Sequence, residues 1–223
     1  MPYSLPDSHI EFFTKHQILE VEDLLPTEDA ETLCQIIEEL LKKRIGQKEL
    51  HNTSNAIFWK AGRNLDKEDP RILKILFQLQ LGKLSYALFK KRPIRIAYTQ
   101  ALCTESPKDS IFSSSDTLLD ISSVSPLLGA IIVCLKSTDP QESTHPDLAH
   151  LKQGNVFFLS EQYLLDFPKF LSQTGIRAFL IALAPGMARY KLEPKDPHTH
   201  ELKKSGYAFG DSLPEEVCSY LYR

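Results

Sequence analysis

The pattern of apolar residues changes once along this chain, near Pro93, and that change constrains the fold most. Before it, apolar residues recur at helical spacing. After it, short apolar and partly β-branched runs cover 94–101, 127–135, 155–160 and 176–183, separated by stretches containing Pro, Ser, Asp and Gly. No interval between these runs has a helical pattern of about 12 residues, which disfavours a parallel βαβ sheet. The pattern predicts the α+β class: a sandwich or barrel of strands braced by helices.

Three amphipathic helices are expected in the first part of the chain. The first is short, with Asp7 or Ser8 as its N-terminal cap, and runs through His16. The second starts at Thr27, with acidic residues in its first turn and basic residues in its last, and stops before Gly46. The third starts at Pro70 and runs to near Pro93. Residues 1–92 are thus predicted to be mainly helical and 93–223 mainly strand, within a single domain of 223 residues.

Composition excludes several classes of protein. With 26 Lys and Arg against 29 Asp and Glu, the net charge is −3, which does not favour nucleic-acid binding. No apolar stretch approaches the ~18 residues of a membrane span, and the N-terminus does not resemble a signal peptide. The four cysteines show no metal-binding spacing. We therefore expect a cytoplasmic protein with reduced thiols and no membrane partner.

Familiar catalytic motifs are also absent from the sequence. It contains no GxSxG, Walker A or GxGxxG pattern. His198 and His200 form an H-x-H pair, for which an exposed polar loop is favoured over a pair of metal ligands. Trp59, the only tryptophan, is expected to serve packing rather than to stack on a ligand.

Four segments, taken in order, carry a family resemblance: FFTKHQILEVEDLLPTEDAETLCQIIEELL, QGNVFFLSEQYLLDF, GIRAFLIALAPGMARYKLEP and GYAFGDSLPEEVCSYLYR. Together they resemble the phytanoyl-CoA dioxygenase-like branch of the Fe(II)/2-oxoglutarate oxygenases, over most of the chain from about residue 10 to 223. The resemblance implies a double-stranded β-helix, a cupin-like jelly roll, with the N-terminal helices on one face.

The resemblance also assigns site residues. The family binds iron through an H-x-D motif and a distal His. Asp116 would be the carboxylate, but Ser114 stands where the first His belongs, and Leu164 and Leu165 stand where the distal His belongs. Arg177 matches the residue that pairs with the distant carboxylate of 2-oxoglutarate, although pairing with a neighbouring acidic residue is equally open.

These substitutions predict that iron chemistry is lost and that Asp116 is vestigial, because neither Ser nor Leu replaces an imidazole ligand. The leading hypothesis is a non-catalytic relative of the dioxygenases that binds a small molecule or a protein and needs no cofactor. The alternative is an active Fe(II)/2-oxoglutarate-dependent dioxygenase, a hydroxylase, whose metal ligands are substituted or lie elsewhere. A third hypothesis, a metal-responsive nucleic-acid-binding protein, has neither a recognition-helix signature nor a basic excess in its favour.

Overall fold

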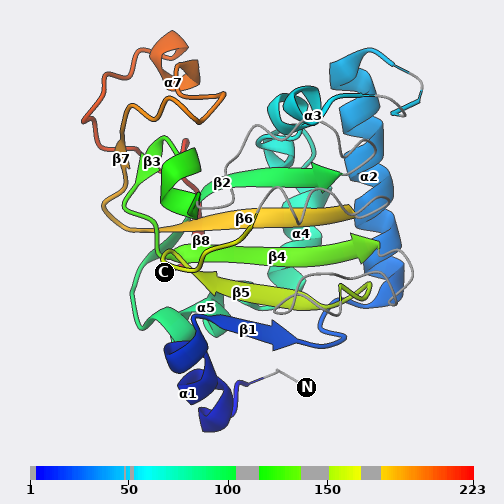
Figure 1. Cartoon of the computed structure of the whole chain (residues 1–223), viewed down its shortest axis with the longest axis vertical. Helices are drawn as coiled ribbons and strands as arrows, with labels where there is room; N and C mark the ends of the chain where they lie inside the picture. The colour runs from blue at the N-terminus through cyan, green and yellow to red at the C-terminus, as the bar shows by residue number, and fades with distance from the viewer. Residues whose placement is uncertain (1–3, 48, 51–52, 104–115, 137–150, 167–176) are drawn as a thin grey trace.

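A six-stranded antiparallel sheet forms the centre of the fold (Figure 1). The computed structural model describes residues 4–47, 49–50, 53–103, 116–136, 151–166 and 177–223. In spatial order the strands are β1 (Ile18–Val21), β5 (Val156–Ser160), β4 (Gly129–Lys136), β6 (Arg177–Pro185), β2 (Ile94–Cys103) and β8 (Tyr220–Tyr222). A second, two-stranded sheet pairs β3 (Val124–Ser125) with β7 (Arg189–Tyr190).

Helices cover one face of the six-stranded sheet, which we call the helix face (Figure 1). The α-helices are α1 (Asp7–His16), α2 (Thr27–Ile45), α3 (Asn55–Ala61), α4 (Pro70–Gln78), α5 (Leu81–Phe89) and α7 (Glu201–Lys204). Two short 3-10 helices, η1 (Leu65–Lys67) and η2 (Leu118–Ile121), complete the set. The long helix α2 packs across β4 and buries Leu33, Ile37 and Leu41 in the core on this face.

The opposite face of the sheet, the second face, has its own apolar core. In β6, Phe179 and Ile181 belong to the helix-face core, whereas Leu180 and Ala182 belong to the second-face core. That second core is closed by η2, β3, β7 and the C-terminal segment that carries Leu213 and Cys218. Because both faces are buried, β4, β5 and β6 read as continuous apolar runs rather than as alternating ones.

The predicted mixture of N-terminal helices and later strands is confirmed, and every strand pair of the large sheet is antiparallel. The third predicted helix is wrong in one respect, because it is two helices, α4 and α5, that meet at 62°. The break lies at Gln80, whose backbone is left-handed with φ of +53°. Gln80 itself is neither Gly nor Pro, and Gly82, two residues later, was the one local sign of a break in the pattern.

The described residues hold no single helix that is long and apolar enough to cross a membrane. Only α4 and α5 taken together reach that length and composition, and they are bent relative to each other.

Candidate functional site

The candidate site lies on the second face, where residues 62–64 run beside β2. The Ala101 N–H donates to the Gly62 carbonyl at 2.9 Å, and the Asn64 N–H donates to the Thr99 carbonyl at 2.9 Å. A Cβ at Gly62 would lie 2.8 Å from the Gln100 amide nitrogen, so only glycine allows this close approach. The pairing sets Arg63 directly opposite Gln100.

A buried ion pair forms the centre of this site. Arg63 Nη2 lies 2.7 Å from Asp196 Oδ1, and the two side chains are only 3% and 4% exposed. The Arg63 guanidinium also lies over the Tyr98 ring, 3.8 Å from its centroid. A pair buried this deeply is favourable only if further hydrogen bonds satisfy both ions.

Asp196 is well satisfied by its neighbours. Its carboxylate accepts the backbone N–H groups of Ser123 and His198, each at 2.9 Å, besides the Arg63 guanidinium. Burial alone would raise the pKa of Asp196, but the Arg63 charge and these hydrogen bonds outweigh it and hold the pKa below its ordinary value. The carboxylate is therefore ionised at neutral pH.

Arg63 is not satisfied to the same degree. Its Nε and Nη1 atoms are buried and have no hydrogen-bond partner within the described part of the chain. The same holds for the Tyr98 hydroxyl and for Gln100 Oε1, whose amide nitrogen donates to the Trp59 carbonyl at 3.0 Å. Burial raises the pKa of Tyr98 more than the neighbouring Arg63 charge lowers it. Buried polar atoms are rarely left unpaired, so a cluster of unpaired donors and acceptors is unusual in a folded chain and calls for an explanation.

His198 closes one side of the site. Its Nε2 lies 3.0 Å from the Lys60 carbonyl. Burial, and then the charge of Arg63, lower the pKa of His198 to about 4, so the imidazole is neutral at pH 7 and donates through Nε2. His200 is exposed and faces Phe209, so the structure does not bring the two histidines together as ligands. The predicted exposed loop is nevertheless wrong in part, because Asp196 and Thr199 within it are buried.

Asp116, the predicted metal-binding carboxylate, is 2% exposed and receives a hydrogen bond from the Lys195 ammonium. That hydrogen bond raises the pKa of Lys195, and the charges of Asp120 and Glu193 add to it. Lys195 and Asp196 are consecutive in sequence. One dipeptide therefore supplies a cation to Asp116 and an anion to Arg63.

Of the other predicted site residues, the structure describes Arg177, Leu164 and Leu165. Arg177 begins β6 on the helix face, where its Nε lies 3.3 Å from Glu38 of α2, so it has an acidic partner of the kind that the sequence left open. Its role toward 2-oxoglutarate stays a prediction. Side-chain directions alternate along a strand, and a shift of one residue moves a side chain to the other face. Leu164 is exposed and Leu165 is buried in the second-face core, whereas Ser114 lies outside the described residues.

The described residues do not assemble an iron centre. No group of three or more His, Cys, Asp or Glu side chains in the described ranges is placed to hold a metal ion. The Asp116 carboxylate is engaged by an ammonium, which is the wrong partner for a metal ligand. His145 and His150 lie outside the described residues.

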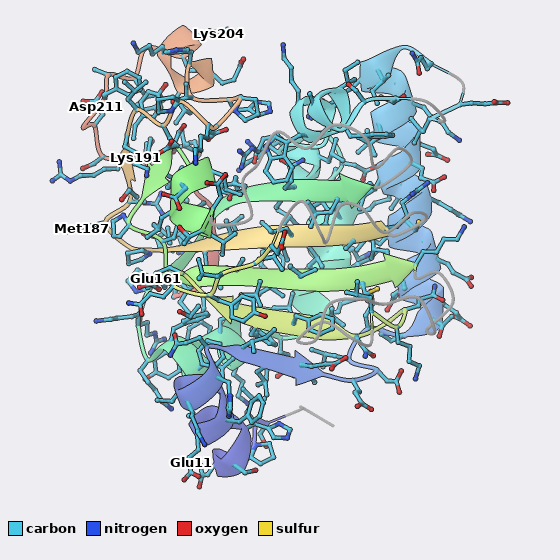
Figure 2. All side chains as sticks on the ribbon, viewed as in Figure 1. Glu11, Glu161, Met187, Lys191, Lys204 and Asp211 are labelled. Atoms are coloured by element: carbon cyan, nitrogen blue, oxygen red, sulfur yellow. The ribbon has the colours of Figure 1, made fainter. Side chains whose placement is uncertain are left out.

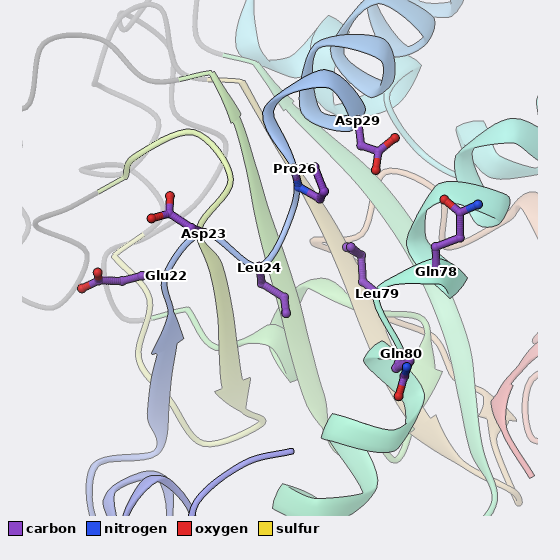
Figure 3. A pocket seen from close by; sticks show the side chains of 8 residues that line it. All are labelled: Glu22, Asp23, Leu24, Pro26, Asp29, Gln78, Leu79 and Gln80. Carbon is purple, nitrogen blue, oxygen red and sulfur yellow. The ribbon is translucent and has the colours of Figure 1, made fainter. Parts of the chain in front are cut away.

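A separate hollow of about 460 Å³ opens beside the helices, between the β1–α2 connection and the corner where α4 meets α5 (Figure 3). Leu24 and Leu79 line it together with three acidic side chains. One of these, Asp23, pairs with Lys152 at 2.9 Å. Its lining includes none of the buried unpaired polar atoms found in the described residues, so the interior site remains the stronger candidate.

Sequence reasoning missed Arg63, Lys195 and Asp196. One signal was present, because Tyr98 and Gln100 are polar residues two apart in a predicted strand, which also contains Arg95 and Thr99. Two such positions share one face of a strand and indicate a polar patch in a buried interior.

The sequence matches no known family model and no curated protein. Its fold, however, is similar to that of several solved structures. One is SnoK, a non-heme α-ketoglutarate-dependent carbocyclase from nogalamycin biosynthesis, with a TM-score of 0.66 and 12% identity over 97% of this chain and 96% of that one. The epimerase SnoN, also non-heme and α-ketoglutarate-dependent, gives 0.60 and 13% over the same shares. CT296 from Chlamydia trachomatis gives 0.52 and 16% over 82% of this chain and 98% of that one. At such identities the likeness shows the fold alone.

Proposed function

We propose that this chain is a non-catalytic binding protein on the double-stranded β-helix of the Fe(II)/2-oxoglutarate oxygenases, and that the site around Arg63 binds a small, oxygen-rich molecule. One observation carries the proposal: the buried Arg63 guanidinium keeps two N–H positions, Nε and Nη1, without a partner in the described residues. An unpaired buried donor costs free energy that an incoming acceptor recovers.

The chemistry of the surrounding atoms favours an oxygen acceptor such as a carboxylate. The guanidinium offers donors in a rigid planar arrangement, which matches carboxylate oxygens. Asp196 accepts a hydrogen bond from only one guanidinium nitrogen, Nη2, because its carboxylate also accepts hydrogen bonds from two backbone N–H groups. Beneath the guanidinium, the Tyr98 ring holds the plane of the guanidinium by a cation–π contact, 3.8 Å from the ring centroid.

The loss of catalysis is inferred from the predicted metal ligands. Ser114, Leu164 and Leu165 stand where the family has histidines, and Asp116 is paired with Lys195. The likeness to SnoK favours the competing function, an active 2-oxoglutarate-dependent dioxygenase. That function would require metal ligands from other positions.

Thermal unfolding with a panel of small carboxylates, including 2-oxoglutarate, succinate and citrate, tests the proposal. At ~100-fold excess over Kd a ligand of the native state adds about 2.7 kcal/mol, which raises the Tm of a domain of this size by about 5–10 °C. We expect a shift that needs no metal and disappears in Arg63→Lys, which keeps a positive charge opposite Asp196 but lacks the two free N–H groups.

Arg223→Lys, at an exposed arginine, serves as the matched control and keeps the shift. Three results would overturn the proposal: no shift with any carboxylate, a shift that survives in Arg63→Lys, or a shift with 2-oxoglutarate that requires Mn(II). The last of these would restore the dioxygenase.

A further inference from the structure

The segment that follows β7 brings Lys195 to Asp116 and is firmly tied to the rest of the site. The Tyr190 hydroxyl donates to the Thr199 carbonyl, and Thr199 Oγ1 accepts the Glu193 N–H at 2.9 Å. Lys191, directly after β7, donates from its Nζ to the Leu119 carbonyl at 2.8 Å. Lys195 therefore lies on a segment whose position is fixed by these hydrogen bonds.

The Lys195 ammonium is one of the groups that satisfy the Asp116 carboxylate. That carboxylate is almost completely removed from solvent, and a buried carboxylate is stable only when a cation or several donors satisfy it. Asp120 and Glu193 lie close enough to act on the same ammonium, and Lys191, which pairs with Glu193 at 3.3 Å, offsets one of these two negative charges. Asp120 is itself held in place by a capping box with Thr117.

The lysine suits this role because of its shape. An ammonium is a compact charge with three donors at the end of a flexible four-carbon stem. Lys195 is half exposed along its length, so the stem reaches in from the surface while the charged end meets the buried carboxylate. A small bound cation would occupy the same kind of position beside a carboxylate.

We propose that the ammonium group of Lys195 takes the place of a bound cation beside the Asp116 carboxylate. The inference rests on the proposed function in one respect, namely that Asp116 is the surviving carboxylate of the family's metal site. The chain then keeps the charge balance of such a site without binding a metal, and removing the ammonium leaves a position that an external cation can fill.

Chemical rescue of the full chain tests this directly. We expect Lys195→Ala to unfold at a lower temperature than the unsubstituted chain and millimolar methylammonium to recover part of the loss. Tetramethylammonium, which has the same charge but no N–H donor, is expected to recover nothing. Mn(II) is expected to raise the Tm of Lys195→Ala and to leave that of the unsubstituted chain unchanged.

Two further variants complete the design. Lys204→Ala removes an exposed lysine at the periphery of α7 and is expected to show no rescue (Figure 2). Lys195→Ala combined with Asp116→Asn is expected to lose the rescue, because no carboxylate is left to receive a cation. Should Lys195→Ala not fold, Lys195→Gln, which keeps the length and a hydrogen-bond donor but not the charge, takes its place.

The proposal is overturned if the Lys195 variants keep the Tm of the unsubstituted chain, if rescue persists without the Asp116 carboxylate, or if tetramethylammonium or Lys204→Ala gives the same effect. None of these results bears on carboxylate binding at Arg63, so the two proposals fail separately.

Discussion

Replacing Asp196 with Asn removes the charge that faces Arg63 while keeping the size of the side chain. Both partners of the ion pair are at most 4% exposed. Breaking a buried pair from one side typically costs about 3–5 kcal/mol, because the remaining charge stays buried and uncompensated. At ~2–4 °C per kcal/mol for a domain of this size, the Tm of Asp196→Asn should fall by about 6–20 °C.

Urea unfolding of four chains measures this: the unsubstituted chain, Asp196→Asn, Arg63→Met, and the double variant. The double variant is expected to be more stable than the sum of the single losses predicts, because no buried ion is left alone. Glu215→Gln breaks an exposed ion pair with Arg223 and should cost no more than about 1 kcal/mol. A loss below ~1 kcal/mol for Asp196→Asn would refute the reasoning that the pair is truly buried and coupled.

The same pair predicts a dependence on pH. Since the pKa of Asp196 is lowered in the folded chain, its contribution to stability is present above its unfolded pKa of about 3.9 and is lost as the pH falls through the folded value. Asp196→Asn should lack this acid-sensitive part of the stability.

Three other predictions concern single positions. With the pKa of His198 lowered to about 4, the free energy of unfolding should fall by up to ~3 kcal/mol between pH 7 and pH 4, and His198→Gln should flatten that slope in urea titrations. Gly154→Ala should destabilise the chain by several kcal/mol in urea, because its φ is +91° and a Cβ would lie 2.7 Å from the Leu25 carbonyl oxygen. The control is Gly206→Ala, which has a similar φ of +89° but lies in open space and should cost only ~1 kcal/mol. Equal losses in the two variants would contradict the role of the contact with Leu25. Burial raises the pKa of Cys134 to about 12 and that of Cys218 to about 11, so neither thiol should react with iodoacetamide at pH 8 until the chain unfolds, as peptide mass mapping can show.

The helices and strands could be predicted where local pattern decides them. The four apolar runs after Pro93 correspond to β2, β4, β5 and β6, because strands buried on both faces remain apolar throughout. The bend at Gln80 could not be predicted, because it depends on how α4 and α5 each pack on the sheet rather than on a breaking residue at that position.

The site was predictable only in part, because its members come from distant segments. Asp116 was assigned through the family resemblance, but Arg63 and Asp196 are 133 residues apart and nothing local pairs them. Arg177 shows the opposite difficulty. Its sequence neighbourhood matched the family, yet the face on which it lies depends on strand register and on Glu38 of α2.

Anaerobic titration of the unsubstituted chain with Fe(II) and 2-oxoglutarate, followed by exposure to oxygen and quantification of succinate, tests the loss of iron chemistry most directly. With Lys195 on Asp116 and no histidine at Ser114, Leu164 or Leu165, we predict no stoichiometric iron and no succinate above the protein-free control. One iron bound per chain together with succinate formation would contradict the non-catalytic assignment.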